Sequence, residues 1–278
     1  MKKNKSLPGI IKRDGRTENF SSRKLYRSLS HSGLPKKDCK SVTQKIEGQV
    51  LDGQSTQEIF QATLNEVRAI SPKAAVRYSL KKSLFELGPS GHHFETYVSR
   101  FYQVRGYRTQ TCQIVRGKFV KHEVDVIAFK NKERIFIECK FHNRAGIKND
   151  IKIALYVKSR WDDLKTGPEG NRVNSFVLAS NTSFSKDALT YAAGTHLNLL
   201  GVNAPEGHSF FDQIREMNLW PLTSLRFLKS RQKEALLSHG IVLVQELIDR
   251  PELLEKAGVG TREKIIILEE AKNVLGQV

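Results

Sequence analysis

The feature that most constrains this chain of 278 residues is a pair of apolar runs that each contain a charge. The first run spans 124–129 and includes Asp125, and the second spans 135–139 and includes Glu138. The polar stretch 130–134 separates them, and this pattern predicts a β-hairpin. A carboxylate inside an apolar strand is costly unless it meets a partner or a metal ion. The two acids therefore need an explanation.

The register of this hairpin predicts that the charged side chains meet. If residues 131–132 form a two-residue turn, counting outward along both strands places Asp125 opposite Glu138. Directly opposed residues have Cβ atoms about 5 Å apart, and Lys140, two residues further on, points to the same face. Two carboxylates this close repel unless a cation lies between them, and hard oxygen ligands suit Mg²⁺ or Mn²⁺. The alternative is a buried ion pair with Lys140; we favour a metal site because both strands are otherwise apolar.

The same residues carry a family resemblance. Asp125, followed by Glu138-Cys139-Lys140, resembles the core of PD-(D/E)xK nucleases. The surrounding segment, 91–163, is similar to Mrr-type restriction endonucleases and to archaeal Holliday-junction resolvases. The resemblance implies a restriction-endonuclease-like α/β fold and a metal-dependent DNA endonuclease.

A glutamate on the helix before the hairpin completes the motif in those families. Here Gly-His-His-Phe-Glu, residues 91–95, opens a helical pattern, and Glu95 matches that position. Val124 stands where the motif name has proline, a position that is loosely kept. The implied catalytic set is Glu95, Asp125, Glu138 and Lys140. The implied metal ligands are Glu95, Asp125, Glu138 and the backbone carbonyl of Cys139.

Charge and composition favour a nucleic-acid partner. The net charge is +17, of which residues 1–88 carry +10, residues 89–228 carry +7 and residues 229–278 carry none. A basic surface favours polyanions, although solubility alone is the simpler reading. We expect no membrane segment, because no long apolar run or signal-peptide pattern occurs. Three separated cysteines without a CxxC spacing argue against a zinc ribbon and suit a reducing cytoplasm.

The N-terminal part predicts a small, mostly helical domain. Residues 1–7 form a basic tail, and Asp14-Gly15 predicts a hairpin turn. Helices are expected over 23–32, 37–51, 56 onward with Thr56 as the cap, and 72–87.

Residues 8–88 resemble an ATP-cone, the module that binds ATP or dATP as an allosteric effector in ribonucleotide reductases. The resemblance rests on four ordered motifs: Ile10-x-Lys-Arg-Asp-Gly-x-x-Glu18, Ser-x-x-Lys24-Leu, Gly53-x-Ser-Thr56-x-Glu-Ile59 and Ala74-Ala75-x-Arg77-Tyr78. It implies that nucleotide contacts fall on Ile10, Lys12, Arg13, Glu18, Lys24, Arg77 and Tyr78. Lysine and arginine side chains can converge on a polyphosphate. A basic hairpin that touches the DNA backbone is the alternative.

After the predicted site, helices are expected over 149–163 and 184–195, and strands over 173–180 and 198–202. Basic side chains on the first helix could follow a phosphate backbone or form an ordinary solvated face: Lys148, Lys152, Lys158 and Arg160. Three histidines near the site are expected in surface or capping roles: His122, His142 and His196.

Residues 225–278 predict a small all-α domain. Gly258-Val259-Gly260-Thr261, between two helices, resembles the turn of a helix-hairpin-helix element, whose backbone N–H groups bind DNA phosphate. The zero net charge of residues 229–278 favours a protein-interaction role almost equally.

Together these features predict a multi-domain α/β protein divided into 1–7, 8–88, 89–224 and 225–278. The predicted function is DNA cleavage by a Mg²⁺- or Mn²⁺-dependent endonuclease under ATP or dATP control, with a homodimer expected. Two alternatives stay open: a nucleotide-sensing DNA-binding regulator with an inert nuclease core, and cleavage of RNA rather than DNA.

Overall fold

The computed structural model describes residues 7–144 and 146–277. Of the predicted basic tail only Leu7 lies within them. The chain divides into two compact units. One comprises the chain through Lys81 together with the end from Glu269, and the other spans Lys82–Leu268. None of the helices within the described ranges is both long and apolar enough to cross a membrane.

The first unit begins with the predicted hairpin. Its strands, β1 (Gly9–Ile11) and β2 (Thr17–Asn19), pair antiparallel with Ile10 opposite Glu18. Gly15 in the turn has a φ of 83°, which suits glycine. The helices that follow are α1 (Ser22–Ser30), α2 (Lys36–Glu47), α3 (Thr56–Ile70) and α4 (Pro72–Phe85).

Several helix ends differ from the sequence predictions by a few residues, and two of them are instructive. Ser55, not Thr56, caps α3: the Ser55 hydroxyl accepts the Glu58 N–H, and the Glu58 carboxylate accepts the Ser55 N–H, which completes a capping box. The prediction placed the helix one residue too late to use this reciprocal pair. Helix α2 ends at Glu47, four residues before the predicted end, because Gly48 follows directly. The core of this unit includes Leu29, Ile46 and Val67, all nearly inaccessible to solvent.

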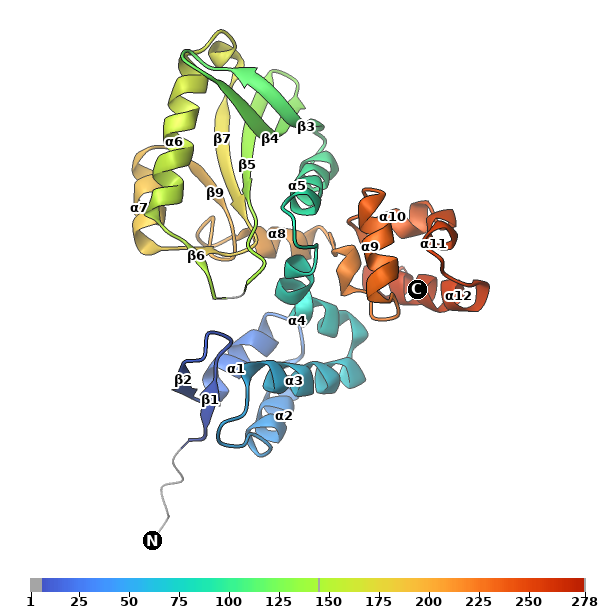
Figure 1. Ribbon diagram of the computed structural model, residues 1–278. Helices are drawn as coiled ribbons and strands as arrows, with labels where there is room; N and C mark the ends of the chain where they lie inside the picture. Colours follow the sequence, from blue (N-terminus) through green and yellow to red (C-terminus); the bar gives the residue numbers. More distant parts are fainter. Residues whose placement is uncertain (1–6, 145, 278) are drawn as a thin grey trace. The chain divides into compact units, whose positions relative to one another are not determined.

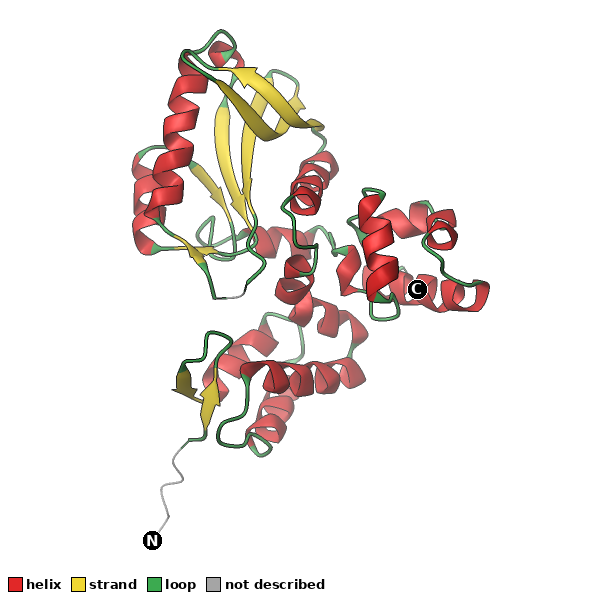
Figure 2. Ribbon diagram, viewed as in Figure 1, coloured by secondary structure: helices red, strands yellow, loops and turns green. Residues whose placement is uncertain are grey.

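The second unit is built on a mixed sheet. Within the described ranges five strands pair in the order β3-β4-β5-β7-β9 (Figures 1 and 2). The pairs β3-β4 and β4-β5 are antiparallel, whereas β5-β7 and β7-β9 are parallel. The strands are β3 (Arg108–Arg116), β4 (Lys121–Lys130), β5 (Glu133–Lys140), β7 (Ser175–Ser180) and β9 (Asn198–Leu200). A separate parallel pair joins β6 (Lys148–Asn149) and β8 (Ser183–Phe184).

Helices cover both faces of this sheet. Helix α5 (His92–Val104) packs against β3 and β4 on one side, and α6 (Ile151–Thr166) and α7 (Lys186–Gly194) lie on the other (Figure 1). The core on the α6 side joins Phe136, Val157 and Phe176, with Trp161 stacked on Phe176. This layering confirms the predicted mixed α/β fold class for the second unit.

The predicted hairpin register is confirmed over its inner half. Lys130 pairs with Glu133, and Val126 pairs with Ile137. Asn131 takes a left-handed φ of 54°, as a tight two-residue turn requires.

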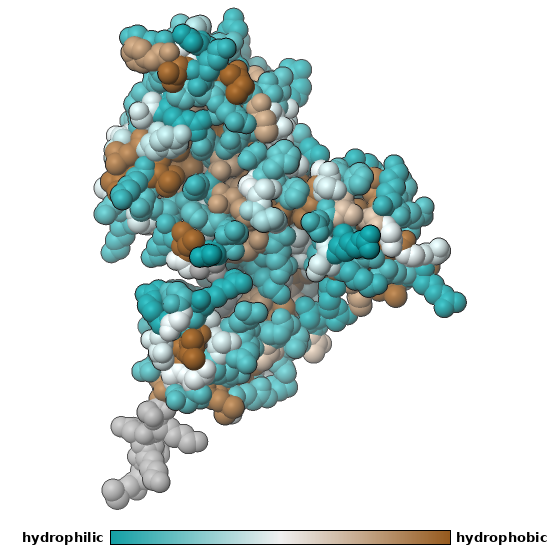
Figure 3. Space-filling model, viewed as in Figure 1, coloured by the Kyte–Doolittle hydropathy of each residue, from teal (hydrophilic) through white to brown (hydrophobic). Residues whose placement is uncertain are grey.

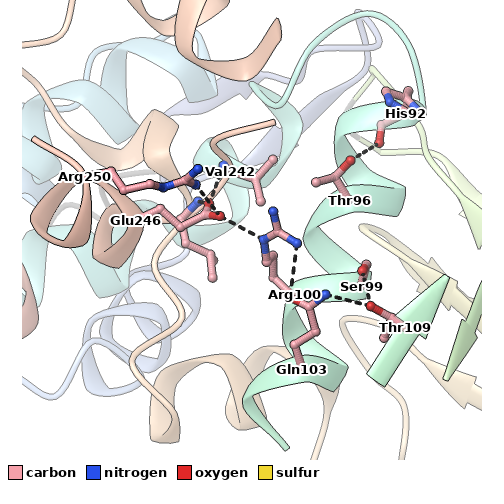
Figure 4. Close-up of polar contacts among 10 residues, drawn as sticks. His92, Thr96, Ser99, Arg100, Gln103, Thr109, Val242, Glu246 and Arg250 are labelled. Carbon is pink, nitrogen blue, oxygen red and sulfur yellow. Dashed lines mark hydrogen bonds and ion pairs between the residues drawn. The ribbon is translucent and has the colours of Figure 1, made fainter. Parts of the chain in front are cut away.

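The remaining elements are helical: α8 (Phe210–Glu216), α9 (Ser230–Ser238), α10 (Val244–Asp249), α11 (Glu252–Lys256) and α12 (Thr261–Leu275), with short 3₁₀ turns at Gly170–Arg172 and Leu222–Ser224. The Tyr97 hydroxyl on α5 donates to the Leu219 carbonyl at 2.6 Å. Arg100, one turn further, donates from Nε to Glu246 of α10 at 2.8 Å (Figure 4). Helix α5 therefore contacts the sheet on one side and Leu219 and α10 on the other.

Glu246 is the centre of that junction. Its Oε2 accepts the backbone N–H groups of Val242 and Leu243. Arg250 Nη2 lies 3.5 Å from Oε1, the oxygen that also binds Arg100 (Figure 4). A carboxylate bound by both guanidinium and backbone donors is held in one orientation.

Candidate active site

Asp125 and Glu138 lie at the outer end of the β4-β5 ladder. Beyond the Val126–Ile137 pair, the Asp125 carboxylate accepts the backbone N–H of Cys139 at 2.7 Å. Asp125 therefore reaches across to the neighbouring strand, as the predicted register requires. On its far side β5 pairs with β7, where Glu138 lies opposite Leu178, so the acid belongs to an interior strand of the sheet.

Burial and mutual repulsion perturb both acids. The pKa of Asp125 is raised from 3.8 to about 7, first by burial and then by the Glu138 charge, while the Cys139 N–H opposes the rise. The pKa of Glu138 is also raised, again by burial first, with Arg160 opposing it. Carboxylates that are costly to ionise without a counter-charge are suited to holding a cation.

Arg160 also belongs to the group of charged residues around Asp125 and Glu138. The sequence predicts it on a helix face that is solvated or contacts phosphate. Its Nη1 lies 2.5 Å from Glu138 Oε2, and the same side chain donates to the Glu123 carbonyl. Only 14% of the Arg160 side chain is exposed. Arg160 therefore has neither of its two predicted roles, since it is neither on a solvated face nor free to contact phosphate. Nothing local in the sequence of α6 revealed the pairing, because the two residues lie 22 positions apart.

Glu95 brings a third carboxylate to the same place. It lies in the first turn of α5 with 19% of its side chain exposed. Its charge contributes to the raised pKa of both Asp125 and Glu138, so the three acids are electrostatically coupled. The structure thus brings together the three carboxylates that the sequence predicted.

Lys140 and Cys139 complete the predicted set. Lys140 is exposed at the end of β5, and its charge lowers the pKa of Glu138. Its carbonyl accepts the Ser180 hydroxyl at 2.7 Å, which fixes the backbone here. The Cys139 thiol is buried, and burial raises its pKa well above the usual range.

The arrangement has the chemistry of a hard divalent site. Two carboxylates with raised pKa values, and a third whose charge adds to the rise, gain stability when a cation neutralises them. Oxygen-only donors suit Mg²⁺ or Mn²⁺. The residues present therefore fit such an ion, and the exposed Lys140 adds a positive charge beside it.

Two of the three histidines singled out in the sequence have structural partners. His122 Nε2 lies 2.7 Å from Asp163, which also accepts the N–H groups of Phe119 and Val120. His142 Nε2 lies 2.8 Å from Asn149. Both histidines are partly buried and pair with residues inside an element, Asp163 in α6 and Asn149 in β6, so neither contact is the expected helix cap. His196 is exposed after α7 with a φ of 54°.

In the first unit, the residues predicted to bind a nucleotide fall into two groups. Glu18 bridges Lys12 at 2.8 Å and Lys24 at 3.2 Å, and these two cations lower its pKa. Ile10 is buried opposite Glu18, and Arg13 is exposed in the adjoining turn.

The other group has different surroundings. Arg77 packs against Gly33, where an added Cβ would lie 2.5 Å from its guanidinium. Tyr78 stacks on Phe60 at 5.1 Å, and burial raises the pKa of its hydroxyl. Both side chains are partly buried, and their nucleotide contacts stay a prediction.

Two family models match the chain. One, described as restriction endonuclease (Mrr_cat), covers residues 88–204, and the other, described as AF1548-like, C-terminal, covers residues 220–275. The first match confirms the predicted restriction-endonuclease-type domain. The second covers most of the predicted C-terminal segment, for which the helix-hairpin-helix resemblance stays a prediction. Residues 1–87 lie outside both, so the ATP-cone stays a prediction.

Individual relatives agree with these matches. An uncharacterised protein from Archaeoglobus fulgidus is 31% identical over 180 residues, which is 64% of this chain and all of the relative. A crystal structure of a protein of unknown function, AF1548, is 29% identical with a TM-score of 0.57, covering 68% of this chain and all of that chain. The crystal structure of protein VC1899 from Vibrio cholerae is 17% identical and covers 70% of this chain and 50% of that chain, but its TM-score of 0.31 is too low to establish a shared fold.

Proposed function

Since the chain belongs to the AF1548-like family and contains a restriction-endonuclease-type domain, we propose that it is a divalent-metal-dependent DNA endonuclease. The observation that supports this most is the convergence of Glu95, Asp125 and Glu138 from α5, β4 and β5. A basic chain with net charge +17 suits a polyanionic substrate.

Each residue has a distinct task in this proposal. Glu95, Asp125, Glu138 and the Cys139 carbonyl would hold Mg²⁺ or Mn²⁺. A bound ion of this kind lowers the pKa of a water molecule and neutralises charge on the scissile phosphate. Lys140, exposed beside Glu138, orients the attacking water and stabilises negative charge that develops on the phosphate oxygens.

Arg160 acts one step away from the reaction. It holds Glu138 in place through the 2.5 Å contact. A bound guanidinium also limits the repulsion among the carboxylates when the metal leaves. Arg160 is therefore a positioning residue.

The first unit is proposed to add nucleotide control. Lys12 and Lys24 already share one carboxylate, Glu18, which shows that both ammonium groups can reach a common anion. The triphosphate of ATP or dATP would bind in the same way, with Glu18 accepting hydrogen bonds from ribose or adenine. Nucleotide would regulate cleavage by favouring one state of a homodimer, and this requires different affinity for the two states.

The test is cleavage of plasmid and branched DNA by purified full-length chain with Mg²⁺ or Mn²⁺, with and without ATP or dATP. Cutting that requires metal and is lost in Asp125→Asn supports the endonuclease. DNA retention and nucleotide binding without any cutting would instead favour a nucleotide-sensing regulator with an inert core. A matched RNA substrate separates the two nucleic acids.

A further inference from the structure

We propose that His92, Glu95 and Cys112 form a second metal site, which binds a borderline-soft divalent ion such as Zn²⁺. Ligand atoms from these three side chains all lie within 4.8 Å of one another. The set offers one nitrogen, one oxygen and one sulfur, whereas the acids of the nuclease site offer oxygen alone. Nitrogen and sulfur ligands select Zn²⁺ over Mg²⁺.

The backbone brings these three residues together from two elements. His92 and Glu95 lie three positions apart in the first turn of α5, so they share one face of the helix. Cys112 lies on β3, the strand against which α5 packs. Its φ of 53° is left-handed in the middle of a strand whose neighbours, Thr111 and Gln113, keep regular pairing with β4.

The distances match a tetrahedral ion. His92 Nδ1 lies 3.5 Å from Glu95 Oε2, and Cys112 Sγ lies 3.7 Å from the same oxygen. Bonds of about 2.0 Å to oxygen and nitrogen and about 2.3 Å to sulfur place tetrahedral ligands about 3.3–3.6 Å apart. Two of the three distances between ligand atoms are thus close to the required length. Water would supply the fourth ligand.

The surroundings favour a cation and leave the ligands accessible. Burial first, and then the charges of Glu95, Glu123 and Asp125, raise the pKa of the Cys112 thiol, so this position has a surplus of negative charge that a cation would offset. His92 and Cys112 are exposed. The adjacent His93 is not one of the three clustered residues, and its Nδ1 lies 2.7 Å from the Leu87 carbonyl oxygen.

One residue, Glu95, would then serve two metals. This part of the inference rests on the proposed endonuclease, in which Glu95 belongs to the Mg²⁺ set. Zn²⁺ bound to His92 and Cys112 would withdraw Glu95 from that set and slow cleavage. The rate of DNA cleavage would thereby depend on the concentration of free Zn²⁺ and on the oxidation state of Cys112.

Binding is tested on the full-length chain by titration with Co²⁺, a spectroscopic substitute for Zn²⁺. Wild type should develop a thiolate-to-cobalt charge-transfer band that Zn²⁺ displaces in a one-to-one ratio. Cys112→Ser should lose the band, and His92→Ala should weaken binding about tenfold or more. Three controls should keep it: Cys39→Ser, a buried thiol of the first unit, His93→Gln, and Asp125→Asn.

The outcomes separate this inference from the endonuclease proposal. A band that survives in Cys112→Ser, or that is absent from wild type, overturns the second site whatever the nuclease does. If the chain cuts DNA, Zn²⁺ should inhibit wild type at least about tenfold more strongly than Cys112→Ser. Equal inhibition of both proteins would overturn the competition for Glu95 while leaving the binding result intact.

Discussion

Two clusters of carboxylates and cations in this molecule use the same residue types and behave in opposite ways. In the first unit, the partly exposed Glu18 has two lysine partners, and its pKa is lowered. In the second, the less exposed Asp125 and Glu138 face one another, and the pKa of each is raised. Burial and the ratio of acidic to basic side chains decide whether the pKa of a carboxylate is raised or lowered.

The difference in charge is the basis of the ligand that we propose for each cluster. Two ammonium groups around one carboxylate leave positive charge for a polyphosphate. Three carboxylates around one guanidinium and one ammonium leave negative charge for a metal ion. The face drawn in Figure 3 is mainly hydrophilic, with scattered hydrophobic side chains.

The largest expected effect is the loss of cleavage in Lys140→Ala. Removing a group that stabilises charge in the transition state costs about 10²–10³ in rate. DNA affinity should change only a few-fold, because one exposed lysine among many basic residues is lost. Single-turnover cleavage and a filter-binding assay measure the two quantities. A variant that still cuts at the wild-type rate would remove Lys140 from the site.

The next effect is on stability. Arg160→Gln should leave Glu138 without its buried partner and destabilise the second unit by about 3 kcal/mol, measured by urea unfolding without metal. Added Mg²⁺ should restore part of this loss, because the ion replaces the missing charge. The matched control is Lys158→Gln on the same helix, whose partner Asp162 is 62% exposed. That variant should lose less than about 1 kcal/mol. Equal losses would contradict the special role of Arg160.

The pH dependence of stability follows from Asp125. Its folded pKa of about 7 lies above its unfolded value of 3.8, so folding takes up a proton between these values. The stabilisation that this proton gives the folded state is complete at low pH and is lost as the pH rises through 7. Metal-free protein should therefore be about 2 kcal/mol less stable at pH 8 than at pH 5 from this group. Asp125→Asn should flatten the slope, and saturating Mg²⁺ should reverse its sign. An unchanged slope in the variant would refute the assignment.

The smallest effect concerns the first unit. Lys12→Ala should weaken ATP binding about tenfold, which corresponds to about 1.4 kcal/mol, because one phosphate contact is lost. Stability should change by less than about 1 kcal/mol, since the Lys12–Glu18 pair is partly exposed. Lys45→Ala removes a comparable exposed pair with Glu66 and should leave nucleotide affinity unchanged. Isothermal titration with ATP and dATP measures both variants. Equal affinities in the two would remove the lysine cluster from nucleotide binding.

The sequence alone determined those features that depend on short-range rules. The turn at 131–132 fixed the register of β4 and β5, and the strand period then placed Asp125 beside Glu138 and Cys139. Alternating runs of strand and helix predicted the mixed α/β layers. The helix ends, decided by single hydrogen bonds such as that of Ser55, were predicted less well.

Only the tertiary structure decided which distant side chains meet. Arg160 reaches Glu138 because α6 packs on the sheet, and Cys112 reaches Glu95 because α5 packs on β3. Contacts of this kind depend on how elements pack, and sequence spacing carries no signal for them. Burial, too, appears only after packing, and it is burial that raises the pKa of Asp125 while Glu18, with its two lysines, moves the other way.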